Sequence, residues 1–286
     1  MSLVVVVGSV KGAPGVTAAA LALAAAWPER ADGAPSVLVE TDRSGGSLLA
    51  WCGAGTDGSG LGGSGLVGLA AAVQHATGGG PGVAFGAYGD ALVCGVAAVR
   101  APAVGPQAAA AVEVLERTRF AVLRQAAGSA RVVVVDAGRL DPVGSSVLGA
   151  ADVLVLVARG GVDAMGHVAG RIEELQARVP IVDLVVVGPS PYEPVEVQAA
   201  FGIGRVHGWP WDPTGVRGLV EGRRGWPRAA LPKAARALAE DLCWRADTGQ
   251  LARPGGGLVP VEPPRGAVAD GAVVTGGGFE DGGGGR

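Results

Sequence analysis

Residues 3–18 read LVVVVGSVKGAPGVTA, and this stretch decides the fold. Its first five residues, Leu3 to Val7, are apolar and almost all β-branched, which predicts a buried parallel strand. A loop rich in glycine follows, and an alanine- and leucine-rich helix is expected to start near Thr17. A strand, a glycine loop and a helix N-terminus together make a site for anionic phosphate, because backbone N–H groups and the helix dipole favour negative charge there.

Strand-like and helix-like segments alternate along the rest of the chain. Further buried strands are expected at residues 36–40, 91–96, 131–136, 153–157 and 181–187. Helices are expected at residues 18–27, 66–75, 106–127, 163–178, 193–201 and 232–245, with a rigid turn at 208–213. This alternation predicts an α/β fold, namely a doubly wound, mostly parallel sheet with helices on both faces.

The composition changes near residue 247. Residues 1–246 carry the strand and helix patterns and are expected to form a single domain. Residues 247–286 are rich in glycine and proline and have almost no apolar periodicity. We expect this C-terminal tail to be disordered.

Charge, cysteine content and hydropathy limit the class of protein. The formal net charge of −3 argues against a protein that coats nucleic acid along its whole surface. The cysteines are odd in number and far apart, which favours reduced residues in the cytoplasm over disulfides or a metal site: Cys52, Cys94 and Cys243. No apolar stretch reaches the roughly twenty residues of a membrane-spanning helix, so we expect a cytoplasmic protein without a transmembrane segment.

The glycine loop, KGAPGVT at residues 11–17, resembles the deviant Walker A loop KGGxGKT of the ParA/MinD family of P-loop NTPases. The resemblance gives Lys11 the place of the signature lysine and Thr17 that of the Mg²⁺-binding hydroxyl. Val16 stands where the family has the lysine that grips the β- and γ-phosphates. The resemblance implies nucleotide binding by the whole loop: Lys11, Gly12, Ala13, Pro14, Gly15, Val16 and Thr17.

Three later segments extend the resemblance to about residue 245. SVLVETD at residues 36–42 is similar to the family's second strand, which implies a catalytic role for Glu40 and Asp42. VVVVDAG at residues 132–138 resembles the Walker B strand and implies a metal site of Thr17, Asp42 and Asp136. HGWPWDP at residues 207–213 resembles the turn that borders the base and implies nucleotide contacts by Pro210 and Asp212. VVVGPSP at residues 185–191 lacks the asparagine that often reads adenine, so the base stays open.

The resemblance implies a nucleotide-dependent switch. ATP or ADP with Mg²⁺ is the expected cofactor, and a homodimer and an unidentified protein are the expected partners. Because Val16 removes the phosphate-gripping cation, hydrolysis is expected to be weak or lost, and enzymatic activity is left open. By analogy with TadZ/CpaE-like localisation factors, the protein would position a Tad-type pilus or secretion assembly, or a partition machinery.

Two alternatives remain open at the level of sequence. The first is a nucleotide-free scaffold that keeps the fold and acts by protein interaction. The second is a DNA-associated partition protein, for which a basic patch is available between residues 217 and 245, although such a run is more often a solvated helix face. Carboxylates at strand ends are also common as helix caps and turn formers, which is the structural alternative for Asp42 and Asp136.

Overall fold

The computed structural model describes residues 3–13, 15–29, 33–52, 64–76, 85–141 and 144–251. These residues belong to one compact unit that spans residues 1–252. The segment from 252 onward lies outside the described residues, and with it most of the predicted tail at 247–286. The boundary after residue 246 therefore stays a prediction.

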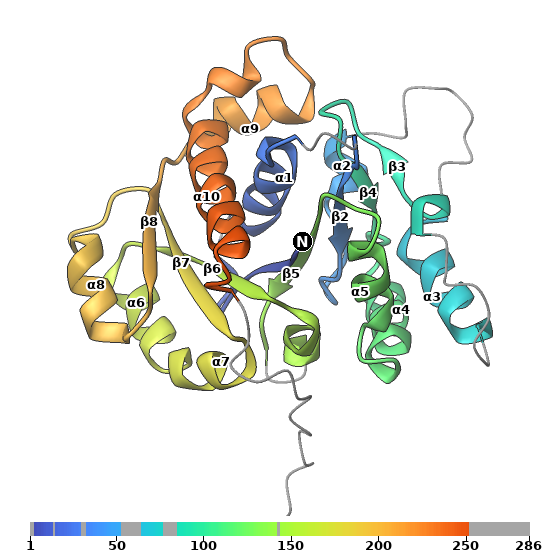
Figure 1. Cartoon of the computed structure of the whole chain (residues 1–286), viewed down its shortest axis with the longest axis horizontal. Helices are drawn as coiled ribbons and strands as arrows, with labels where there is room; N and C mark the ends of the chain where they lie inside the picture. The colour runs from blue at the N-terminus through green and yellow to red at the C-terminus, as the bar shows by residue number, and fades with distance from the viewer. Residues whose placement is uncertain are drawn as a thin grey trace, which may run out of the picture. The chain divides into compact units, whose positions relative to one another are not determined.

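An eight-stranded sheet forms the centre of this unit, in the order β3-β4-β2-β5-β1-β6-β7-β8 (Figure 1). All neighbouring strands pair in parallel except β3 and β4, which are antiparallel. The predicted doubly wound, mostly parallel α/β fold is confirmed. The strands are β1 (Leu3–Ser9), β2 (Ser36–Glu40), β3 (Asp90–Ala91), β4 (Ala97–Val99), β5 (Val132–Arg139), β6 (Val153–Arg159), β7 (Ile181–Val187) and β8 (Arg205–Trp209).

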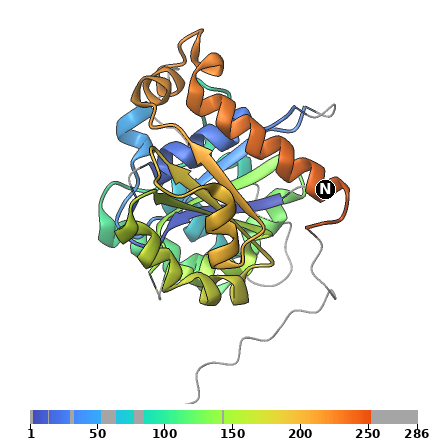
Figure 2. The ribbon, with the colours of Figure 1, turned by 90° about the vertical axis from the view of Figure 1, so that its left-hand side faces the viewer.

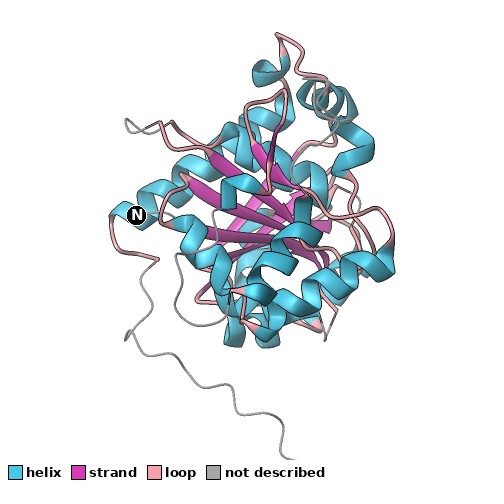
Figure 3. Cartoon of the chain, turned by 90° about the vertical axis from the view of Figure 1, so that its right-hand side faces the viewer, coloured by secondary structure: helices cyan, strands magenta, loops and turns pink. Residues whose placement is uncertain are grey.

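Helices cover both faces of the sheet (Figure 3). One face is covered by α1 (Val16–Ala26), α9 (Pro213–Val220) and α10 (Ala230–Asp247). The long helix α10 runs beside α1 there (Figures 1 and 2). The opposite face is covered by α3 (Gly65–His75), α4 (Gly105–Arg117), α5 (Ala121–Ala127), α6 (Val162–Ala169), α7 (Ile172–Arg178) and α8 (Pro194–Phe201). A short helix, α2 (Leu48–Cys52), follows β2.

Valine runs build the core because each central strand is buried on both sides. In β1, Val4 and Val6 belong to the cluster under α3–α8, whereas Val5 and Val7 belong to the cluster under α1 and α10. This alternation along one strand holds the two helical layers to a common sheet. None of the helices in the described part combines the length and apolar character that crossing a membrane requires. None of the three cysteines, all of which are described, forms a disulfide.

Three sequence-based boundaries were wrong. The strand expected at 91–96 is mainly the turn between β3 and β4, where Gly95 takes a positive φ of 82°. The helix expected at 106–127 breaks into α4 and α5 because Arg119 and Phe120 both adopt positive φ. The helix expected at 163–178 breaks near Gly170 into α6 and α7.

The edge strand β8 was missed because its polar residues hide its pattern. Arg205 and His207 lie on the face that carries α10. Arg205 forms an ion pair with Asp241 of that helix, and His207 Nε2 lies 3.8 Å from Oδ2 of the buried Asp183 of β7. The Arg245 guanidinium from α10 forms ion pairs with both Asp183 and Asp241. Oxygen and nitrogen atoms of Asp183, His207 and Asp241 lie within 4.8 Å of one another, but Arg245 already supplies the positive charge that a metal ion would bring.

Candidate functional site

The glycine loop joins the end of β1 to the start of α1. Gly12 and Gly15 adopt φ values of 79° and 106°, a region that glycine enters without steric cost. The buried hydroxyl of Ser9 accepts hydrogen bonds from the backbone N–H groups of Gly12 and Ala13, each at 2.9 Å. Ser9 therefore closes the loop, and a bound anion would compete with its oxygen for these two donors. Pro14, part of the predicted loop site, lies outside the described residues.

Val16 and Thr17 open α1 with different surroundings. The Val16 side chain is 5% exposed and belongs to the apolar cluster beneath α1 and α10. The Thr17 side chain makes a hydrogen bond with Asp136 of β5. The first turn of α1 thus offers a hydroxyl beside a carboxylate but no cation.

Lys11 lies on the exposed side of the loop. Its Nζ is 2.8 Å from Nε2 of His167, which belongs to α6. The contact holds the side chain toward α6 at the carboxyl edge of the sheet. Lys11 is the one lysine of the loop, because the only other lysine in the chain is Lys233.

Asp136 is the most perturbed acid of this edge. It pairs in register with Val7 of β1 and with Glu40 of β2, and it is 1% exposed. Its Oδ1 accepts a 3.0 Å hydrogen bond from the N–H of Gly138. Burial raises the pKa of Asp136 to about 7 against the hydrogen bonds from Thr17 and Gly138, and the charges of Glu40 and Asp42 add to the rise.

Asp42 reaches the same place from the loop after β2. Its Oδ1 accepts hydrogen bonds from the backbone N–H and the hydroxyl of Ser44, at 2.8 and 2.6 Å. A Cβ built on Gly138 would lie 1.8 Å from Asp42 Oδ2, so this carboxylate lies directly against the Gly138 backbone. Only a glycine at 138, which also has a φ of 57°, admits this approach.

Glu40 has a structural role in this arrangement. One carboxylate oxygen accepts from the N–H groups of Ser47 and Leu48 at 2.7 and 2.9 Å, and the other from Ala101 at 3.0 Å. Burial raises its pKa despite these three hydrogen bonds. The side chain therefore fixes the start of α2 and the segment after β4. This geometry does not favour the catalytic role expected for Glu40, which stays a prediction.

The oxygens gathered here fit a magnesium ion by their chemistry. Mg²⁺ prefers hard oxygen ligands and usually keeps several waters beside one or two carboxylates. Thr17 and Asp136 are hydrogen-bonded, and Asp42 raises the pKa of Asp136 through its charge. A divalent cation would relieve the repulsion between these carboxylates.

The perturbed Asp136 predicts a pH effect on stability. Its folded pKa of about 7 exceeds the ordinary value of 3.8, so between these values the native state binds more protons than the unfolded state. The free energy of unfolding contributed by this group therefore falls as pH rises from about 4 to 7. With Mg²⁺ removed by a chelator, we expect Asp136→Asn to be more stable than the wild type at pH 8, with a smaller difference at pH 5. Urea unfolding at the two pH values measures this, and equal differences would contradict it.

A cavity of about 270 Å³ lies beside the start of α1. It is bordered by Gly15 of the loop and by the turn after β8, which contains Pro210 and Asp212. Its walls are mostly apolar, and three tryptophans contribute to them: Trp51, Trp209 and Trp211. A flat aromatic ring, such as a nucleobase, would find stacking surfaces there.

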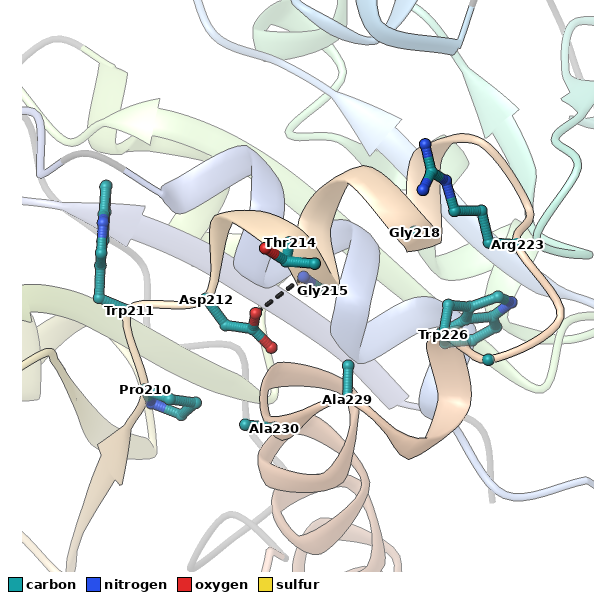
Figure 4. Close-up of a pocket in the computed structure, with 11 residues that line it drawn as sticks. Pro210, Trp211, Asp212, Thr214, Gly215, Gly218, Arg223, Trp226, Ala229 and Ala230 are labelled. Atoms are coloured by element: carbon teal, nitrogen blue, oxygen red, sulfur yellow. Dashed lines mark hydrogen bonds between the residues drawn. The ribbon is translucent and has the colours of Figure 1, made fainter.

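Asp212 is a helix cap in this turn. Its Oδ1 accepts from the N–H of Gly215 at 2.8 Å (Figure 4), and its Oδ2 accepts from the N–H of Leu231 at 3.1 Å. Both oxygens therefore hold the starts of α9 and α10. A second cavity of about 530 Å³, also bordered by Asp212, is lined by α9, Trp226 and the start of α10. None of the described residues of the glycine loop borders this larger cavity, whereas Gly15 borders the smaller one.

The structure thus brings some of the predicted site residues together and gives others a structural role. The structure brings Thr17, Asp42 and Asp136 together below the glycine loop, with Pro210 at the neighbouring cavity. It gives Glu40 and Asp212 structural hydrogen bonds. Sequence reasoning missed Ser9, Gly138 and the tryptophans. Ser9 is the last residue of β1, so its place at the carboxyl edge of the sheet was a signal that could have been used.

We compared the sequence and the fold of this chain with known proteins. No protein-family model and no curated protein matches the sequence. Solved structures do match. The chain has the fold of the ParA and MinD ATPases.

Three of the matching structures illustrate the likeness. A ParA family ATPase from Chlorobium tepidum TLS has a TM-score of 0.63 at 16% identity, covering 84% of this chain and 98% of that one. The septum site-determining protein MinD of Pyrococcus horikoshii OT3, complexed with Mg-ADP, also has a TM-score of 0.63, at 18% identity, covering 88% and 100%. The MinC:MinD cell division protein complex of Aquifex aeolicus has a TM-score of 0.60 at 15% identity, covering 85% and 96%. At these identities the likeness establishes the fold alone.

Proposed function

We propose that this protein is a nucleotide-binding switch that positions a larger assembly, with hydrolysis weak or lost. One observation carries the proposal: the Thr17 hydroxyl is hydrogen-bonded to a buried Asp136 beneath a glycine loop. A buried carboxylate with a raised pKa is costly unless a cation neutralises it, and such groups gather at functional sites. The Mg-ADP bound to the MinD neighbour supports a nucleotide with Mg²⁺ as the ligand.

Each part of the site has a proposed task. The backbone N–H groups of the loop residues other than Pro14, together with the N-terminus of α1, would hold the phosphates. Thr17, Asp42 and Asp136 would hold Mg²⁺, which supplies positive charge to the phosphate oxygens. The tryptophan-lined cavity would take the base.

Val16 sets the limit on catalysis. Phosphoryl transfer depends on positive charge around the transferred group, and removing one cation affects the transition state most. Val16 is buried in an apolar cluster and brings no charge. We therefore propose that the bound nucleotide acts as a switch ligand.

The partner and the process are proposals from fold analogy. The MinD neighbour from Aquifex aeolicus was solved together with MinC, which supports a partner protein for this chain as well. A Tad-type pilus or secretion system and a partition machinery are the assemblies we propose, with a nucleotide-dependent homodimer in the cytoplasm. A DNA-binding patch between residues 217 and 245 is less favoured, because Arg245 is buried in ion pairs and Arg223 pairs with Glu221.

Lys11→Ala tests the switch. If Lys11 is the remaining side-chain cation at the phosphates, its loss is expected to abolish nucleotide binding together with any nucleotide-dependent dimer. Calorimetry and light scattering with and without nucleotide and Mg²⁺ measure the two effects. Lys233→Ala on α10 is the matched control. A Lys11→Ala protein that binds and dimerises like the wild type would leave Lys11 an ordinary surface residue.

A nucleotide-free scaffold is the second candidate, and Ser9 favours it. The Ser9 hydroxyl already accepts from two N–H groups that would otherwise meet a phosphate. In this case the wild type would bind no nucleotide, and Ser9→Ala would free the two donors without creating a site.

A further inference from the structure

Glu40 is a buried carboxylate without a task in the proposed function. It ends β2 and is 1% exposed. One of its oxygens accepts from the N–H groups of Ser47 and Leu48, at 2.7 and 2.9 Å, and the other accepts from Ala101 at 3.0 Å. A Cβ built on Gly46 would lie 2.6 Å from the second oxygen, so the chain that enters α2 passes directly against this carboxylate. Glu40 therefore connects the end of β2 to the start of α2.

The short helix α2 carries part of the wall of the cavity of about 270 Å³. It begins at Leu48, which is fully buried in the cluster beneath α1 and α10. One turn later, Trp51 lines the cavity together with Gly15 of the glycine loop and Ala18 of α1. Trp51 is 39% exposed, so its indole keeps accessible surface for a ligand. The placement of α2 by Glu40 and Leu48 thus sets the position of the indole against the first turn of α1.

The length of the Glu40 side chain matters for this placement. An aspartate at position 40 would be shorter by one carbon–carbon bond, about 1.5 Å. Its oxygens would then lie beyond hydrogen-bonding distance of the N–H groups that now donate to Glu40. These hydrogen bonds are charge-assisted and belong to the strong class. The start of α2 is therefore expected to shift when Glu40 is shortened.

We propose that Glu40 is a positioning residue for the nucleotide base, because it fixes α2 and with it the Trp51 indole on which the base stacks. Stacking on an aromatic side chain suits any base, since every base has a flat π-face. The inference rests on the proposed function, since it concerns the base of the nucleotide held at the glycine loop. It gives Glu40 an effect on binding of the base and none on binding of the phosphates.

The test compares two ligands, each with Mg²⁺: ATP, and inorganic tripolyphosphate, which presents a phosphate chain without a base. Calorimetry gives Kd for each, and we expect the wild type to prefer ATP. Trp51→Ala is expected to raise Kd for ATP about fivefold or more, which is the effect of one stacked base, and to leave Kd for tripolyphosphate unchanged. Trp244→Ala is the matched control, because Trp244 is exposed on α10 and borders neither of the two cavities described above.

Glu40→Asp is expected to reduce the preference for ATP in the same way. Because Glu40 acts through Trp51, the double variant should bind ATP no more weakly than Trp51→Ala alone. Glu113→Asp shortens a glutamate on the exposed face of α4 and should keep the wild-type preference. Thermal melting checks that Glu40→Asp is folded. If it is not, Glu40→Gln takes its place with the same expectation, since it keeps the length of the side chain and exchanges one acceptor for a donor.

The outcomes separate this inference from the proposed function. A folded Glu40 variant that keeps the wild-type preference, or that weakens both ligands equally, overturns the positioning role, as does a double variant whose losses add. Equal binding of ATP and tripolyphosphate by the wild type also overturns it and leaves the proposed phosphate site standing. Binding of neither ligand overturns the proposed function and, with it, this inference.

Discussion

Replacement of Asp183 by alanine is expected to lower the free energy of unfolding by about 3–5 kcal/mol. Asp183 is fully buried, and Arg245 is only 5% exposed. Arg245 donates to both carboxylate oxygens, with 3.2 Å between Nη1 and Oδ1. Without Asp183, the one partner left to this guanidinium within the described part of the chain would be Asp241, so most of its desolvation cost would be uncompensated. Urea unfolding at pH 7 measures the difference.

Two further variants serve as controls for this prediction. Glu221→Ala breaks an exposed pair with Arg223 and should change the free energy of unfolding by less than about 1 kcal/mol. The double variant Asp183→Leu with Arg245→Met removes both charges at similar volume and should recover most of the loss. A loss below about 1 kcal/mol in Asp183→Ala would show that the buried pair does not hold α10 to β7.

The same pair predicts a loss of stability in acid. Burial alone would raise the pKa of Asp183, but the nearby His207 side chain and the hydrogen bonds from Arg245 lower it overall. A carboxyl with a depressed folded pKa stabilises the native state above its unfolded value and loses this contribution as the pH falls through the folded value. The contribution of Asp183 is therefore present at neutral pH and disappears below the ordinary pKa of 3.8.

Val16→Lys is expected to tighten nucleotide binding about ten- to a hundredfold. A lysine hydrogen-bonded to phosphate contributes about 1.5–3 kcal/mol, which corresponds to this change in Kd. Val16 is the first residue of α1. The residue before it, Gly15, borders the cavity of about 270 Å³, and the residue after it, Thr17, is hydrogen-bonded to Asp136. Calorimetric titration with Mg²⁺-nucleotide measures the effect.

The control for this substitution is Val16→Leu, which enlarges the side chain without adding charge and should leave the affinity unchanged. Because Val16 is buried, thermal melting must first show that Val16→Lys stays folded. A folded Val16→Lys protein with no gain in affinity would favour the nucleotide-free scaffold.

The central part of the fold could be predicted because it depends on short-range patterns. Runs such as Leu3–Val7 and Val132–Val135 are apolar on both faces, and this is typical of inner parallel strands. The edge strand β8 could not be predicted in this way. Its Arg205 and His207 face charged partners from β7 and α10, which lie far away in the sequence.

The candidate site could likewise be predicted only in part. Thr17 and Asp136 could be placed together because both follow strands whose carboxyl ends share one edge. The structural roles of Glu40 and Asp212 could not be predicted. They depend on the N–H groups of Leu48, Ala101 and Leu231, which only tertiary packing brings near the two carboxylates.

Calorimetric titration of the wild-type protein with GTP and with ATP, each in the presence of Mg²⁺, decides whether the glycine loop binds a nucleotide. We predict saturable binding at one site per chain that weakens strongly when Mg²⁺ is chelated, because Thr17, Asp42 and Asp136 would hold the ion. The absence of heat and of any rise in melting temperature with either nucleotide at millimolar concentration would contradict this prediction.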